Sequence, residues 1–308
     1  MEFKHIPVML EECISGLNIK PDGIYVDGTL GGAGHSSYIV QKLNENGLLI
    51  GIDRDQEALN SAKQKLINYN NVKYVHGNHD DILDILQDLG IDKVDGILLD
   101  LGISSYQIDN SERGFSYMQD NKLDMRMDQS QDLSAWDVIN NYKEEDLANI
   151  IYKYGEEKFS RRIAKNICIK RQEKPINTTF ELVDIIKESV PNNPKEGHPA
   201  KRTFQAIRIE VNGELKPLYD TISNSIKALK PQGRLCVITF HSLEDGIVKQ
   251  AMQDLSGKCT CPPGLPYCVC GAKSFGRVIT RKPIIPTEKE YNENSRSRSA
   301  KLRIFERN

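Results

Sequence analysis

Short apolar runs that end in a glycine or a carboxylate recur along the first third of the chain. Residues 23–27 (GIYVD) and 48–53 (LLIGID) are two of them, and residues 71–82 contain a third. Residues 96–99 (GILL) are apolar throughout, which is typical of a central parallel strand buried on both faces. Between these runs, as in residues 36–43, apolar positions recur at helical spacing. The alternation predicts an α/β fold with a parallel sheet.

A long block without strand alternation follows, from residue 110 to about residue 212. It reads as loops and helices, and Thr178 and Glu181 give a capping-box pattern before one apolar run. Strand patterns return in residues 233–240 and 300–305. We therefore expect a helical insertion, residues 110–212, within a core made of residues 1–109 and 213–308. An insertion at the carboxyl end of a strand is well placed to hold a substrate.

Two later motifs carry polar residues whose role the pattern leaves open. In residues 202–215, the side chains of Gln205, Arg208 and Asn212 share one helical face, which either meets solvent or serves a function. His241 follows the strand pattern of residues 233–240 and faces either a crevice or the core. Ser242 and Asp245 are expected to cap the next helix.

The composition indicates a globular protein of the cytoplasm. The chain has 308 residues, of which 39% are hydrophobic and 27% charged, enough for one large or two ordinary domains. No apolar run approaches the ~20 residues that span a membrane. The first residues lack a basic segment followed by an apolar one, so we expect neither a signal peptide nor a membrane partner.

The 7 cysteines do not indicate a disulfide framework, because their number is odd and no export signal accompanies them. Four of them gather at Cys259, Cys261, Cys268 and Cys270. Such a cluster either closes a structural zinc site away from the chemistry or consists of reduced thiols. C-x-C is less usual than C-x-x-C in zinc sites, so we assign no metal ligand here.

The net charge of -2 hides an uneven distribution. Residues 153–208 hold 13 Lys and Arg against 7 Asp and Glu, and residues 271–308 hold 10 against 4. Two basic segments on an acidic body are consistent with a nucleic-acid footprint, and equally with solvated helix faces.

The first strand pattern runs into a glycine-rich turn, DGTLGGAGHS, which indicates a site for a nucleotide-like cofactor. Gly28, Gly31, Gly32 and Gly34 do not follow G-x-G-x-x-G, so the dinucleotide fingerprint is disfavoured. S-adenosylmethionine fits better, since it has a ribose for a carboxylate but no pyrophosphate for a helix terminus. An ordinary strand-turn-helix remains the simpler alternative on this turn alone.

Acids follow three of the strand patterns, at Asp27, Asp53 and Asp100. The carboxyl ends of parallel strands meet at one edge, where ligands of open α/β sheets bind. Asp53 is placed to accept the hydroxyls of a ribose, and Asp27 to meet the ammonium or sulfonium side. His79 and Asp80, after the third strand pattern, are candidates for an adenine contact, by stacking and by a carboxylate.

Taken together, the motifs resemble one family across nearly the whole chain. They are HIPVML, DGTLGGAGHS, DGILLDLGISSYQID, RGFSY, LDMRM, YGEEKFSRRIA, RTFQAIRIEVNGEL, ITFHSLED and NSRSRSAKLR. In this order they resemble the bacterial small-subunit ribosomal RNA (cytosine-N4)-methyltransferases, the RsmH or MraW family. The resemblance implies a class I (Rossmann-like) S-adenosylmethionine-dependent methyltransferase with an inserted helical domain, acting on a cytosine in the decoding region of ribosomal RNA. The RNA is either free or part of the assembled small subunit, and the oligomeric state stays open.

The resemblance also implies a set of cofactor contacts in this sequence: Ala33, Gly34, His35, Asp53, His79, Asp100 and Gln107. The chain departs from the family at two positions. It has His79 where the family commonly has Phe in HGNF, and Gly246 where the family tends to have Arg after HSLED. Imidazole preserves a flat surface for stacking, whereas glycine removes any contact that the arginine makes with RNA.

The reaction that these features suggest is methyl transfer to the exocyclic N4 of cytosine, without a covalent enzyme intermediate. The protein must position that amine and accept hydrogen bonds from it. Asp100 is the candidate catalytic residue, together with backbone groups of residues 101–104, while Tyr106 or Phe115 is a candidate stacking surface. The base must be unstacked to reach the crevice.

Two alternatives remain at this level. One is a DNA or small-molecule amine methyltransferase of the same fold, although the D-P-P-Y type of tetrapeptide is missing after the fourth strand. The other is a non-catalytic RNA-binding or ribosome-assembly protein that keeps a vestigial cofactor pocket.

Overall fold

The computed structural model describes residues 7–104, 113–191, 197–258, 261, 267, 271 and 273–308. The chain divides into two compact units. Unit 1 comprises residues 1–102 and 215–308, and unit 2 comprises residues 103–214. The predicted insertion, residues 110–212, lies inside unit 2.

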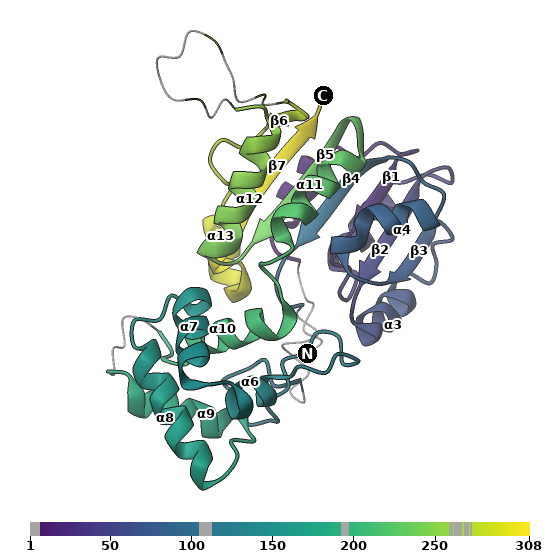
Figure 1. Ribbon diagram of the computed structural model, residues 1–308. Helices are drawn as coiled ribbons and strands as arrows, with labels where there is room; N and C mark the ends of the chain where they lie inside the picture. The colour runs from purple at the N-terminus through teal and green to yellow at the C-terminus, as the bar shows by residue number, and fades with distance from the viewer. Residues whose placement is uncertain are drawn as a thin grey trace. The chain divides into compact units, whose positions relative to one another are not determined.

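Unit 1 is built on a seven-stranded sheet with the order β3-β2-β1-β4-β5-β7-β6 (Figure 1). The strands β1 to β5 are parallel neighbours, whereas β7 is antiparallel to both β5 and β6. Their bounds are β1 (Ile24–Asp27), β2 (Leu48–Asp53), β3 (Val72–His76), β4 (Val94–Asp100), β5 (Leu229–Thr239), β6 (Gly276–Val278) and β7 (Lys301–Arg307). The predicted α/β class with a parallel sheet is confirmed, and the short β6 had no strand pattern of its own.

Helices cover both faces of this sheet. One face packs against α1 (Leu10–Leu17), α2 (Gly34–Gln41) and α3 (Gln56–Lys65), and the other against α4 (Ile82–Asp88), α11 (Leu218–Ala228) and α12 (Ser242–Leu255). Figure 1 shows α4, α11 and α12 in front of the strands. Residues 94–99 of β4 are buried because both faces are covered, which explains the unbroken apolar run of residues 96–99. Short elements complete the unit: η1 (His79–Asp81), α13 (Glu288–Glu293) and η4 (Ser295–Ser299).

Unit 2 is helical, with a separate hydrophobic core. Its helices are α6 (Ala135–Asn141), α7 (Glu144–Gly155), α8 (Ser160–Glu173), α9 (Thr179–Ser189) and α10 (Lys201–Asn212). The capping box predicted at Thr178 is present: the Thr178 side chain accepts from the Glu181 N–H, and the Glu181 side chain accepts from the Thr178 N–H. No helix in the described ranges is both long and apolar enough to cross a membrane.

Two sequence expectations need correction, on the cap of α12 and on Phe115. The helix α12 is capped by His241 and not by Ser242 or Asp245, since Nδ1 of His241 accepts the N–H of Glu244. Asp245 instead binds Arg303 and Lys301 of β7. The ring of Phe115 is only 8% exposed and belongs to the core of unit 2, so it offers no stacking surface.

The polar face of α10 does not simply meet solvent. Gln205 donates to the carbonyl of Tyr154, and Arg208 forms an ion pair with Glu214. Asn212 accepts the N–H of Met127 and donates to the carbonyl of Met125. This face therefore joins α10 to neighbouring segments of unit 2.

Candidate active site

Acids stand at the ends of three adjacent strands of unit 1. Asp27 ends β1, Asp53 ends β2 and Asp100 ends β4. In the sheet register Asp27 pairs with Gly51 and with Leu98, each of which lies two residues before the acid on its own strand. The strand ends therefore converge at one edge, where β1 separates β2 from β4. Ligands of open α/β sheets bind at this point of reversal.

The turn after β1 is closed by backbone hydrogen bonds that reach the neighbouring strands. Gly28 N–H donates to the carbonyl of Leu98, and Leu30 N–H donates to the carbonyl of Ile52. The chain then turns through left-handed conformations at Gly31 (φ 49°) and Ala33 (φ 55°) before α2 begins. A Cβ on Gly32 would meet no described residue within 4 Å, so the turn has open space on this side.

Asp53 holds this turn from the neighbouring strand. Its Oδ2 accepts the N–H of Gly31 at 2.7 Å, and its Oδ1 accepts the N–H of Asp55 at 2.9 Å. A carboxylate has about four lone-pair sites, so both oxygens retain capacity for a further donor. Burial raises the pKa of Asp53 to about 6, although both backbone hydrogen bonds favour the charged form.

Asp27 is turned inward. It is 2% exposed, its Oδ2 accepts from the Ser36 hydroxyl at 2.7 Å, and its Oδ1 accepts from the Thr29 N–H at 3.2 Å. Burial raises the pKa of this carboxyl, and both hydrogen bonds oppose that rise. Asp27 therefore fixes the turn and the start of α2. The sequence pattern predicted a ligand contact instead. A pattern does not show which carboxylates are hydrogen-bonded to other residues of the protein.

Asp100 is the acid with an unused oxygen. Its side chain is 26% exposed, and Oδ1 is buried without a hydrogen-bond donor among the described residues. Burial raises the pKa of Asp100 to about 6; the imidazole of His35 opposes the rise, and Asp27 and Glu244 add to it. Its backbone N–H donates to Thr29 Oγ1 at 2.6 Å, which ties β4 to the turn. Sequence reasoning missed Thr29, for which the only signal was a hydroxyl in the turn DGT.

The three residues at the start of α2 contribute differently. Ala33 is fully buried, so its side chain is not available to a ligand. Gly34 is packed so closely that a Cβ would lie 2.9 Å from Pro7 Cγ. His35 is 5% exposed; its Nε2 donates to the carbonyl of Val8 at 2.9 Å, while Nδ1 lies 3.7 Å from Asp100 Oδ2. Because a carbonyl only accepts, Nε2 carries a hydrogen.

His79 lies beside the first turn. A Cβ on Gly28 would be 3.1 Å from the Cβ of His79, so the two segments touch. Burial lowers the pKa of His79 to about 4; Asp80 opposes the shift and Arg54 adds to it, so the imidazole is neutral at pH 7. Asp80 is occupied: Oδ1 accepts from the Thr221 hydroxyl, and Oδ2 accepts from Asn78 at 2.7 Å.

Some sequence candidates cannot be placed. Gln107 and Tyr106 lie outside the described residues, as do three of the four clustered cysteines, Cys259, Cys268 and Cys270. Within the described ranges no group of three or more His, Cys, Asp and Glu side chains is arranged to hold a metal ion. The zinc alternative is therefore untested.

The edge fits a nucleoside that carries a positive charge. Asp53 offers oxygens for a ribose, the open side of Gly32 leaves room for it, and a neutral His79 offers a flat ring. Oδ1 of Asp100 lies beside the turn and has no hydrogen-bond donor among the described residues. An electron-rich edge of this kind suits a sulfonium and an amine better than a pyrophosphate, whose charge it would repel.

This fold and this edge define a class I, Rossmann-like S-adenosylmethionine-dependent methyltransferase. Over residues 2–308 the chain matches the MraW methylase family, and it belongs to that family. It is 59% identical over 305 residues to a ribosomal RNA small subunit methyltransferase H of Clostridium botulinum (strain 657 / Type Ba4), covering 99% of both chains. It is 57% identical over 310 residues to the protein of that name from Lachnospira eligens, covering 100% of this chain and 98% of the relative. The resemblance seen in the motifs is confirmed.

Proposed function

We propose that this methyltransferase modifies small-subunit (16S) ribosomal RNA, at the exocyclic N4 of a cytosine in the decoding region. The names of its relatives support ribosomal RNA as the substrate. The observation that carries the chemistry is Oδ1 of Asp100 at the end of β4, which no described residue bonds and which lies next to the turn that Asp53 holds.

The cofactor contacts in this proposal follow from the strand ends. Asp53 accepts the two ribose hydroxyls, and the backbone of Ala33, Gly34 and His35 faces the methionine part. His79 stacks on the adenine. Its lowered pKa favours this contact, because burying a neutral ring under the adenine costs less desolvation free energy than burying a charged one. Gln107 remains a candidate from the family resemblance. When bound, S-adenosylmethionine supplies an electrophilic methyl group on a sulfonium.

Asp100 acts on the amine of the cytosine. Its carboxylate accepts one N–H of the amino group, which localises electron density on N4 and orients it. The amine must lose a proton after transfer, and a carboxylate with a pKa of about 6 takes up a proton more readily than an ordinary aspartate. His35 keeps the carboxylate in place through its contact with Oδ2.

Unit 2 supplies the RNA contacts in this proposal. The side chains of Arg161, Lys165 and Lys170 on α8 are exposed, which suits phosphate binding. The RNA is bound either free or in the assembled small subunit, and the methyl-transfer assay compares these two substrates. Such a substrate implies that the protein acts in the cytoplasm.

Transfer of a tritiated methyl group to purified small subunits, free small-subunit RNA and duplex DNA tests the proposal. We expect incorporation into RNA or subunits, recovered after nuclease digestion as N4-methylcytidine. Incorporation into DNA alone would contradict it. Cofactor binding without incorporation into any of the three would instead favour the non-catalytic RNA-binding alternative.

A further inference from the structure

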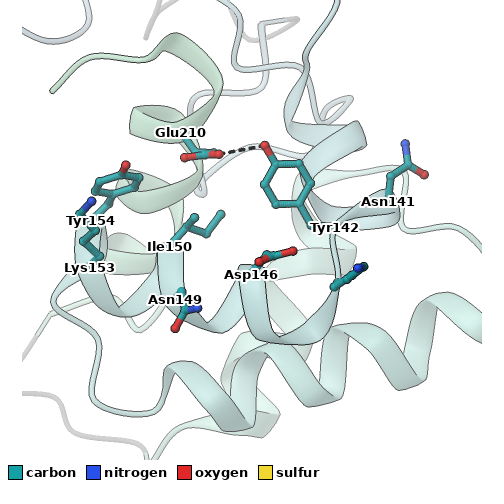
Figure 2. A pocket seen from close by; sticks show the side chains of 9 residues that line it. Asn141, Tyr142, Asp146, Asn149, Ile150, Lys153, Tyr154 and Glu210 are labelled. Atoms are coloured by element: carbon teal, nitrogen blue, oxygen red, sulfur yellow. Dashed lines mark hydrogen bonds between the residues drawn. The ribbon is translucent and has the colours of Figure 1, made fainter. Parts of the chain in front are cut away.

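A pocket of about 520 Å³ is formed within unit 2 by one face of α7, the segment before it, and α10 (Figure 2). Its lining includes Tyr142, Asn149, Ile150, Lys153, Tyr154 and Glu210. None of the residues assigned above to the methyl donor or the target amine contributes to it, so its function needs a separate account.

The pocket has aromatic sides and an apolar base. Figure 2 shows Tyr142 and Tyr154 on opposite sides of Ile150, with Glu210 between them. Tyr142 and Tyr154 are half-buried, which leaves part of each ring available for contact. A flat heterocycle is the type of group that such walls bind, because stacking on an aromatic face does not depend on a particular hydrogen bond.

Glu210 gives the pocket a directional acceptor. Its Oε1 accepts from the Tyr142 hydroxyl at 2.8 Å, which fixes the carboxylate. No residue in the described part of the chain donates to Oε2. Burial, followed by the hydrogen bond to Glu210, raises the pKa of Tyr142 to about 12, so this hydroxyl remains a donor at every physiological pH.

The charges of the lining balance. Lys143 and Lys153 offset Asp146 and Glu210, and the Nζ of Lys153 lies 5.2 Å from the ring centroid of Tyr154. A free cation therefore finds as many repelling as attracting groups. A neutral ring joined to a phosphate suits both kinds of charge, since the ring can donate hydrogen bonds to the carboxylate while the phosphate pairs with a lysine.

We propose that this pocket binds an unpaired guanine of the RNA substrate, an inference that rests on the proposed function. Guanine presents two adjacent N–H donors on its Watson–Crick edge, which a carboxylate accepts in a bidentate manner. Uracil presents one N–H between two carbonyl oxygens that repel the carboxylate. Unpaired bases stacked on aromatic side chains and read on this edge are the common mode of sequence-specific RNA recognition.

Fluorescence anisotropy of two labelled single-stranded RNA octamers tests the site. Both consist of adenosines, with a central guanosine in one and a central uridine in the other. We expect the full-length protein to bind the guanosine octamer about tenfold more tightly, within the range measured for a good bidentate base contact. Glu210→Gln should reduce that preference to less than twofold without weakening the uridine octamer.

Two further variants make the assignment specific. Glu145→Gln removes the same charge from an exposed position on α7 outside the pocket and should keep the tenfold preference. Tyr142→Phe keeps the ring but releases Glu210, and should lower the preference by an intermediate factor. Thermal unfolding of each variant excludes loss of fold as the cause; if Glu210→Gln is unfolded, Tyr142→Phe decides the matter.

Equal affinity for both octamers, or a preference that survives Glu210→Gln, would overturn the proposal. Tight binding of an arginine-rich peptide that depends on Glu210, without a guanine preference, would assign the pocket to a basic protein instead. The methyl-transfer assay is read separately: if Asp53→Asn loses transfer but keeps the guanine preference, the pocket stands whatever the fate of the catalytic proposal.

Discussion

At the scale of single residues, the two acids Asp53 and Asp100 share an unusual property. Burial raises the pKa of each to about 6, so each ionises near neutral pH. A carboxyl whose pKa is higher in the folded protein than in the unfolded chain binds its proton more readily when folded. Its ionisation between about pH 4 and 6 therefore lowers the free energy of unfolding. A ligand that donates hydrogen bonds to the ionised carboxylate restores part of the lost free energy of unfolding.

The affinity for S-adenosylhomocysteine should follow the ionisation of Asp53. Titration calorimetry should give an affinity about tenfold weaker at pH 5 than at pH 7, because only the ionised fraction of a carboxyl with a pKa near 6 is competent. Asp53→Asn should bind more weakly at pH 7 and show a flatter pH profile. The exposed control Asp84→Asn should behave like the wild type. Undiminished affinity in Asp53→Asn would remove the ribose assignment.

The ring of His79 should matter for its shape and not for its charge. His79→Ala should weaken the binding of S-adenosylhomocysteine by roughly fivefold, about 1 kcal/mol, the low end for one base stacked on an aromatic group. His79→Phe should keep the affinity within about twofold, because the pKa of His79 leaves it uncharged at pH 7. His76→Ala, an exposed histidine on the same segment, is the control. If His79→Phe is as weak as His79→Ala, stacking is not the role of this side chain.

At the scale of elements, sequence patterns predicted the hydrogen bonds whose two partners are close together in the sequence. Thr178 and Glu181 are three residues apart and predict their own capping box. The cap of α12 was assigned wrongly because Ser242 is the usual residue type, whereas the structure uses His241 with its buried partner Glu244. Asp245 was unavailable as a cap because β7, far along the chain, supplies Arg303 and Lys301 to it. A partner that distant leaves no periodic signal.

Gly246 should be a site at which stability can be gained. It lies inside α12, and a Cβ there would come within 4 Å of no residue that the structure describes. Gly246→Ala should raise the free energy of unfolding by about 0.5–1 kcal/mol, the usual cost of a glycine within a helix. Gly155→Ala is the matched contrast, since its Cβ would lie 2.6 Å from the carbonyl oxygen of Arg202 and should destabilise unit 2. Chemical denaturation measures both, and destabilisation by Gly246→Ala would contradict the account.

At the scale of the whole molecule, the sequence predicted the sheet and the edge that carries the acids. Buried parallel strands leave long apolar runs, and the acids at their ends are visible as Asp53 and Asp100. The sequence did not predict what the side chains do in three dimensions. Asp27 and Phe115 were candidates for ligand contacts. Asp27 instead accepts a hydrogen bond from the Ser36 hydroxyl, and Phe115 is buried in the core of unit 2. Burial and internal partners decide these outcomes.

The most direct test of the account is the rate of methyl transfer by Asp100→Asn, measured with saturating S-adenosylmethionine and small-subunit ribosomal RNA substrate. Asparagine keeps the shape of the side chain but cannot take up a proton. The account predicts that kcat falls by about two orders of magnitude, as for other general acid–base residues, while KM for S-adenosylmethionine stays within about threefold. An unchanged kcat, or a loss confined to KM for S-adenosylmethionine, would contradict it and assign Asp100 to the cofactor alone.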